Sequence, residues 1–181
     1  MISPVIIPRG YRHLISATLA ELGIPEKLIE QRRLPVCPEA TELAIAEVES
    51  SGREHRLTPE TAAAWSAMRR AAAADGIELH IVSAFRSFER QAELIRRKLE
   101  RGLSLEEILA VSAPPGYSEH HTGRAVDIGC PGEPPLEDSF ERTDGFSWLL
   151  RYAGEFGFTL SYPRNNRFGY SYEPWHWAQK S

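Results

Sequence analysis

Apolar residues recur at helical spacing in several segments of the chain. The pattern predicts two short helices within residues 11–33, separated at Gly23-Ile24-Pro25, and further helices over residues 58–74, 88–101, 104–111 and 145–156. Residues suited to helix ends support these boundaries. Thr58 and Ser104 can each accept a hydrogen bond from a first-turn amide, and Gly157 can end the last helix.

Short runs of β-branched and apolar residues between these helices predict strands. The expected strands span residues 42–47, where the alternation is weak, and residues 77–83, 124–128, 158–162 and 175–178. Proline and glycine mark loops at residues 113–117 and 129–137. Several helices packed on one small, mostly antiparallel sheet make an α+β fold, which is the class that we expect.

Length and composition are those of an ordinary globular protein. The chain has 181 residues, 42% hydrophobic and 25% charged, which fits one domain and excludes a collagen or a membrane bundle. Its net charge of -4 gives no cationic field to attract nucleic acid, so we expect no nucleic-acid partner. The chain is long enough to be stable without oligomerisation, and a monomer is the simplest expectation.

No export or membrane segment is visible in the sequence. The N-terminal apolar run Val5-Ile6-Ile7 is closed by Pro8, whereas a signal peptide needs about 7–15 apolar residues and a membrane helix about 18. We therefore expect a soluble protein with no transmembrane segment. It would be cytoplasmic as given, or periplasmic or cell-wall associated if an export signal was removed.

Candidate chemistry is found in two histidine-containing segments, SEHHTGRAVD at residues 118–127 and EPWHW at residues 173–177. The two cysteines, Cys37 and Cys130, fit no metal spacing, and we expect buried thiols. In a strand over residues 124–128, alternation places Val126 and Ile128 on one face and Asp127 on the other. An acid in that position needs a charged partner or water.

A loop that folds back can bring His120 to Asp127, and His176 from a distant strand would complete a His-Asp-His set. Three such ligands without thiolates favour an open, catalytic zinc site over a closed structural one. His121 is the alternative to His120 as the ligand. Glu173, three residues before His176, is the expected acceptor of a proton from metal-activated water.

Together with SAFRS at residues 83–87 and with Gln91, these motifs resemble the VanY/VanX-type D-alanyl-D-alanine carboxypeptidases, zinc peptidases of bacterial peptidoglycan. That family is related to lysostaphin-type peptidases and to the hedgehog signalling domain. The resemblance covers residues 57–178 and implies Zn²⁺ ligands, a catalytic base and a substrate-facing cation. These would be His120, Asp127 and His176 as ligands, Glu173 as base, and Arg86 as cation, with Gln91 and Ser118 as weaker candidates for holding the substrate.

The resemblance implies a D,D-carboxypeptidase that hydrolyses the C-terminal D-alanine of peptidoglycan stem peptides. Arg86 would bind either the terminal carboxylate or the oxyanion of the reaction. An L,D-carboxypeptidase, an L-alanyl-D-glutamate endopeptidase and a non-catalytic, hedgehog-like zinc-binding module are the alternatives. We expect residues 57–181 to form the peptidase domain and residues 1–56 to form a helical extension outside the motifs.

Overall fold

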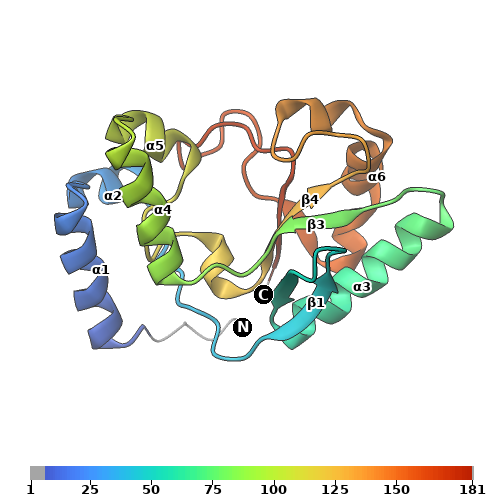
Figure 1. Cartoon of the computed structure of the whole chain (residues 1–181), viewed down its shortest axis with the longest axis horizontal. Coiled ribbons are helices and arrows are strands. Elements are labelled where there is room, and N and C mark those ends of the chain that lie inside the picture. Colours follow the sequence, from blue (N-terminus) through green and yellow to red (C-terminus); the bar gives the residue numbers. More distant parts are fainter. Residues whose placement is uncertain (1–6, 181) are drawn as a thin grey trace.

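The computed structural model describes residues 7–180 and has the predicted α+β architecture (Figure 1). Its α-helices are α1 (Arg9–Glu21), α2 (Glu26–Arg32), α3 (Pro59–Ala74), α4 (Phe88–Glu100), α5 (Leu105–Val111) and α6 (Asp144–Tyr152). Three short 3₁₀ helices are η1 (Glu119–Thr122), η2 (Asp138–Arg142) and η3 (Ala153–Phe156). The strands are β1 (Ala44–Val48), β2 (Glu54–Leu57), β3 (His80–Ser83), β4 (Ala125–Gly129), β5 (Phe158–Leu160) and β6 (His176–Gln179).

Four of the strands form one antiparallel sheet in the order β3-β4-β6-β5. Strand β4 lies in the middle and pairs with β3 on one side and with β6 on the other. In this register Asp127 stands opposite Ser83 on β3 and opposite His176 on β6. Residues from three distant parts of the sequence therefore meet at one point of the sheet. Strands β1 and β2 form a separate hairpin, in which β2 was not predicted.

Local capping residues set the starts of several helices, as the sequence predicts. Thr58 accepts a hydrogen bond from the amide of Thr61 at the start of α3. At the start of α5, Ser104 and Glu107 form a capping box, in which each side chain bonds the other residue's amide. Such caps satisfy amides that have no partner within the helix.

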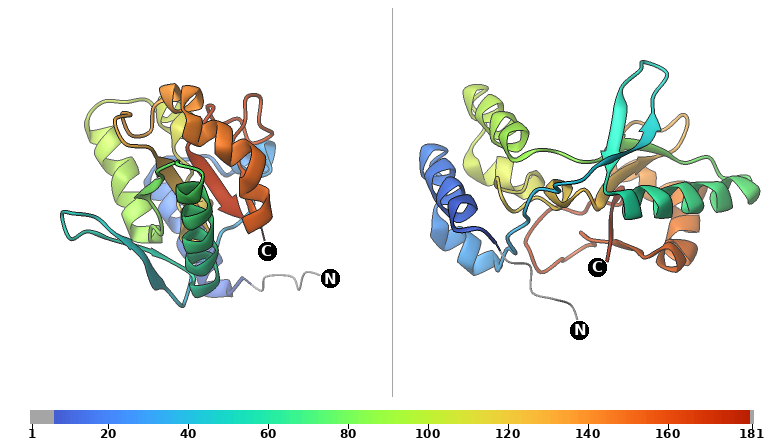
Figure 2. Two further views of the ribbon diagram at one scale, coloured as in Figure 1. Left: turned by 90° about the vertical axis from the view of Figure 1, so that its right-hand side faces the viewer. Right: turned by 90° about the horizontal axis from the view of Figure 1, so that it is seen from below.

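Two apolar cores hold the elements together. The larger core packs α3, α6 and the sheet around side chains such as Trp65, Ile128 and Trp177. The second core joins α1 and α2 to α4 and α5, and it includes Leu19 and Ile95. In Figure 1, α1, α2, α4 and α5 gather on one side of the molecule and α3 and α6 on the other; Figure 2 shows the same separation from below. The N-terminal helices α1 and α2 thus pack onto α4 and α5, which follow the SAFRS motif at residues 83–87.

Two further expectations concern thiols and membranes. Cys37 and Cys130 are both buried and free, as predicted. Over residues 7–180, no helix combines the length and the apolar character that crossing a membrane requires.

Candidate metal centre and active site

The alternation of β4 sets the position of Asp127. Val126 and Ile128 are buried in the larger core, so Asp127 points to the opposite face of the sheet. There it is 4% exposed and lines a cavity of about 300 Å³, which residues of α4, α5 and the loops beside the sheet also line. The buried carboxylate is stabilised by nearby imidazoles. Burial alone would raise the pKa of Asp127, but the neighbouring His120 and His176 lower it below its usual range.

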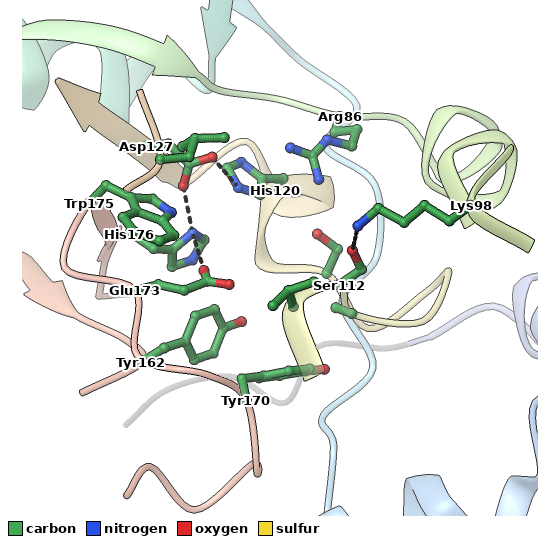
Figure 3. Close-up of a pocket in the computed structure, with 14 residues that line it drawn as sticks. Arg86, Lys98, Ser112, His120, Asp127, Tyr162, Tyr170, Glu173, Trp175 and His176 are labelled. Atoms are coloured by element: carbon green, nitrogen blue, oxygen red, sulfur yellow. Dashed lines mark hydrogen bonds and ion pairs between the residues drawn. The ribbon is translucent and has the colours of Figure 1, made fainter. Parts of the chain in front are cut away.

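His120, Asp127 and His176 meet in this cavity, and one potential ligand atom from each lies within 4.8 Å of the others (Figure 3). His120 Nε2 is 3.2 Å from Asp127 Oδ2, and His176 Nδ1 is 2.9 Å from Asp127 Oδ1. Two imidazole nitrogens and one carboxylate oxygen are a ligand set that zinc uses in catalytic sites. The side chains therefore fit a metal ion.

Hydrogen bonds on the far side of each imidazole orient the two rings. His120 Nδ1 donates to the carbonyl of Ala84 at 2.7 Å, which leaves Nε2 free to act as a ligand. His176 Nε2 is 2.9 Å from a carboxylate oxygen of Glu119, which leaves Nδ1 on the side of Asp127. Such partners fix the orientation and tautomer of histidine ligands in metal sites.

Glu119 is a site residue that the sequence analysis missed. Its carboxylate is mostly buried, and the hydrogen bond with His176 keeps its pKa below the usual value although burial acts to raise it. Burial acts to lower the pKa of His176, but Asp127 and Glu119 raise it to about 10. The two carboxylates thus favour a positive charge at the position of the His176 ring. The sequence signal was the acid directly before His120, but nothing local connects it with a strand 57 residues away.

Tyr162 completes the packing around this ligand. Its ring stacks on the ring of His176 with centroids 4.6 Å apart and an interplanar angle of 22°. The tyrosine is 6% exposed and belongs to the second core. The imidazole of His176 is therefore held by a hydrogen bond on one edge and by an aromatic ring on one face.

Glu173 lines the same cavity, and its Oε2 lies 3.9 Å from His176 Nδ1. The residue stands in a loop before a turn at Pro174 and Trp175 that leads into β6. Backbone bonds fix that loop, since the Glu173 amide donates to the Tyr162 carbonyl at 3.1 Å. Burial raises the pKa of Glu173 to about 7. A carboxyl group of this pKa can take up and release a proton near neutral pH.

Arg86 faces the cavity from the loop between β3 and α4. Its two terminal nitrogens donate to Gln91 Oε1 and Ser83 Oγ, each at 3.0 Å. Gln91 is 1% exposed, and its amide nitrogen donates to the carbonyl of Ala113 at 2.7 Å. Gln91 thus braces Arg86 against the 113–117 loop. Ser118, also a predicted substrate contact, is buried and lines the cavity.

His121, the alternative ligand, points elsewhere. Its Nδ1 donates to the carbonyl of Arg86 at 2.7 Å, and its Nε2 accepts from the amide of Gly116 at 3.1 Å. Both ring nitrogens are therefore used by the backbone, and the ring is completely buried. Burial lowers the pKa of His121 to about 4, which keeps the ring neutral as these bonds require. His121 joins the Arg86 backbone to the 113–117 loop and does not take part in the metal cluster.

The chain is similar to known proteins over most of its length. Residues 54–179 match the family model of VanY, described as D-alanyl-D-alanine carboxypeptidase. YodJ of Bacillus subtilis (strain 168) is 34% identical over 163 residues, which is 84% of this chain and 59% of YodJ. This chain thus spans about three fifths of the length of that relative.

Two solved structures are similar over most of the chain. The LD-carboxypeptidase LdcB, whose structure concerns peptidoglycan recognition, has a TM-score of 0.70 and 33% identity, covering 78% of this chain and 69% of LdcB. A mutant of the vancomycin-resistance D,D-pentapeptidase VanY, from the VanB-type cassette and in complex with Zn(II), has a TM-score of 0.62 and 28% identity. That match covers 80% of this chain and 82% of VanY.

Proposed function

The chain belongs to the VanY family of D-alanyl-D-alanine carboxypeptidases, and we propose that it is a zinc-dependent D,D-carboxypeptidase. Its substrate would be the peptidoglycan stem peptide, from which it removes the C-terminal D-alanine. One observation carries this proposal. A buried His-Asp-His cluster, a carboxyl group with a raised pKa and an arginine all face one cavity.

His120, Asp127 and His176 would hold the zinc ion. Their donor atoms suit zinc, and the VanY structure with similar fold was solved with Zn(II). The hydrogen bonds that the two rings donate to the Ala84 carbonyl and the Glu119 carboxylate keep one nitrogen of each ring free for the ion. A bound zinc ion lowers the pKa of water and polarises a carbonyl oxygen.

Glu173 would act as general base and then as general acid. Its carboxylate accepts a proton from the attacking water and returns the proton to the departing amine of D-alanine. The proton is exchanged most readily when the pKa of the carboxyl group lies near the working pH, and burial places that of Glu173 at about 7.

Arg86 would bind the free carboxylate of the terminal residue. A guanidinium matches a carboxylate with parallel hydrogen bonds, and a carboxypeptidase must recognise that group. Ser83 and Gln91 fix the guanidinium before the substrate enters, which reduces the ordering required on binding. Ser118, on the cavity wall, would offer a further hydrogen bond to the peptide.

An L,D-carboxypeptidase is the second candidate. LdcB has a higher TM-score against this chain than the zinc-bound VanY mutant, 0.70 against 0.62. The two activities share the metal and the base and differ in the residue that precedes the cleaved bond.

The test is to incubate the zinc-loaded protein with purified tetrapeptide and pentapeptide stems and to identify each product by mass. Release of D-alanine from the pentapeptide alone supports the D,D activity, whereas release from the tetrapeptide indicates the L,D activity. Internal cleavage would indicate an endopeptidase. Zinc binding without hydrolysis of either stem would contradict the proposed enzyme and indicate a binding module.

A matched preparation treated with a chelator gives the metal dependence. We expect product formation to stop when zinc is removed and to return when zinc is added, with the metal content measured in the same samples. Full activity in a metal-free sample would contradict the role of the ion.

A further inference from the structure

A lysine on α4 contributes an ammonium group to the cavity that the proposed chemistry does not use. Gln91, Ile95 and Lys98 lie three and four residues apart and so share one face of the helix. Gln91 braces Arg86 and Ile95 is buried in the second core, while Lys98 lines the cavity. Figure 3 shows its amino group on the side of the cavity opposite Asp127 and His176.

The ammonium group of Lys98 has donors to spare. Its Nζ donates to Ser112 Oγ at 2.7 Å, and an ammonium carries three N–H donors. Among the described residues, no carboxylate oxygen lies within 4.0 Å of this nitrogen, so Lys98 forms no ion pair there, unlike Arg56, Arg96 and Arg164. The two carboxylates that line the same cavity, Asp127 and Glu173, make no ion pair with Lys98, so this half-buried cation can still stabilise a bound anion.

The charges around Lys98 also favour a bound anion. Burial lowers the pKa of Lys98, and Arg86 lowers it further, while Glu173 opposes the shift. Lys98 and Arg86 thus repel each other across the cavity. A bound anion would offset this repulsion and would compensate Lys98 for its loss of hydration.

Another residue of the cavity wall, Tyr170, has a polar group without a partner. Tyr170 lines the same cavity, and its buried hydroxyl makes no hydrogen bond in the part of the chain that the structure describes. The amide of Ser171 donates to the carbonyl of Ala110 at 2.8 Å, which fastens the Tyr170 segment to the end of α5 next to Ser112. A buried hydroxyl without a partner costs free energy unless a ligand supplies one.

We propose that Lys98, Ser112 and Tyr170 form a second anion subsite, separate from Arg86, for a side-chain carboxylate on the N-terminal side of the cleaved bond. The inference rests on the proposed function and adds a substrate preference to it. Among stem peptides, meso-diaminopimelate at the third position offers such a carboxylate, whereas lysine at that position ends in an ammonium alone. Lys98 would attract the first and repel the second.

The test compares two pentapeptides, L-Ala-γ-D-Glu-X-D-Ala-D-Ala, in which X is meso-diaminopimelate or L-lysine. Their dissociation constants are measured on the zinc-loaded, full-length Glu173→Gln variant, so that hydrolysis does not consume the ligand. We expect at least about tenfold tighter binding of the diaminopimelate peptide, the size of one hydrogen bond to a charged group. Adding Lys98→Met should remove this preference, because it weakens binding of the diaminopimelate peptide and does not weaken binding of the lysine peptide, and Lys98→Arg should keep part of the preference.

Arg101→Met is the matched control, because Arg101 is an exposed cation just after the same helix. In the enzyme with Glu173 intact, Lys98→Met should raise KM for the diaminopimelate peptide and leave kcat nearly unchanged. Equal affinity for the two peptides, or an equal loss of both in Lys98→Met, would overturn the subsite. These binding results stand even if neither peptide is hydrolysed, which would contradict the proposed function and not this inference.

Discussion

At the residue scale, Glu173 combines burial with closeness to the candidate ligands. Replacement by Gln keeps the size of the side chain and removes its ability to take up a proton. We expect Glu173→Gln to lower kcat for D-alanine release by about 10²–10⁴-fold, which is the usual contribution of a general base. The zinc content should not change, because Glu173 is outside the proposed ligand set.

Glu155→Gln is the control for Glu173, since Glu155 is an exposed acid in η3. It should retain the kcat of the unaltered enzyme. If Glu173→Gln also retained that kcat with a full complement of zinc, another group would have to be the base.

Glu119 acts on the site through His176 and is a positioning residue. Glu119→Ala removes the partner of His176 Nε2, whereas Glu119→Gln keeps an oxygen that can accept the hydrogen bond. We expect a loss of about 10–100-fold in zinc affinity for Glu119→Ala, as for other partners of metal-bound histidines. Competition with a chromogenic chelator measures the affinity, and Glu119→Gln should recover part of it. Equal affinity in all three proteins would mean that the hydrogen bond does not position His176.

The sequence predicted that His120, Asp127 and His176 meet, because their spacing, the strand alternation and a family resemblance all indicated one site. The structure brings these side chains together, while their catalytic use stays a prediction. Glu119 and His121 were harder to interpret. Each acts through a partner that is remote in sequence, the imidazole of His176 and the carbonyl of Arg86, and no local pattern reveals such a pairing.

At the element scale, helices were predicted more closely than strands. Helix starts depend on residues within one turn, and α3 and α5 begin where Thr58 and Ser104 indicated. A strand depends on the partner beside it. Strand β2, with the sequence EHRL, has no clear β pattern of its own and is formed by pairing with β1.

Gly116, in the 113–117 loop, allows the loop, α1 and α4 to approach one another. Its φ is 87°, and a Cβ added there would lie 2.5 Å from Ile15 Cγ1. Gly132, with φ of 83°, has nothing within 4 Å of the same position and serves as the control. We expect Gly132→Ala to cost about 1–2 kcal/mol from the left-handed backbone alone. Gly116→Ala should cost about 1–3 kcal/mol more, from overpacking.

Denaturant titration of both glycine variants measures these free energies of unfolding. Equal destabilisation would show that α1 moves aside freely and that the contact with Ile15 does not constrain the loop. A larger effect at Gly116 should be accompanied by a higher KM, because the Gly116 amide bonds the imidazole of His121, which in turn bonds the Arg86 backbone.

At the scale of the whole molecule, the family assignment and the α+β class were predicted correctly, and the division at residue 56 stays a prediction. The sequence pattern did not reveal that the N-terminal helices share a core with the cavity wall. Tyr162 and Tyr170 pack in the same core as Leu19, and Tyr162 also stacks on His176. This arrangement couples the N-terminal helices physically to the site.

The coupling predicts that residues 1–56 and the rest of the chain unfold together. Leu19 is 1% exposed in the shared core, so Leu19→Ala should cost about 2–5 kcal/mol and lower the midpoint of one common transition in calorimetry. Leu14, on the same helix but 42% exposed, is the control, and Leu14→Ala should change stability by no more than about 0.5 kcal/mol. A separate early transition in Leu19→Ala, with D-alanine release unchanged after it, would instead show that the N-terminal helices are dispensable to the site. If the helix that carries Leu19 also holds Tyr162 against His176, the variant should show a single transition at a lower temperature, and activity should be lost across that transition.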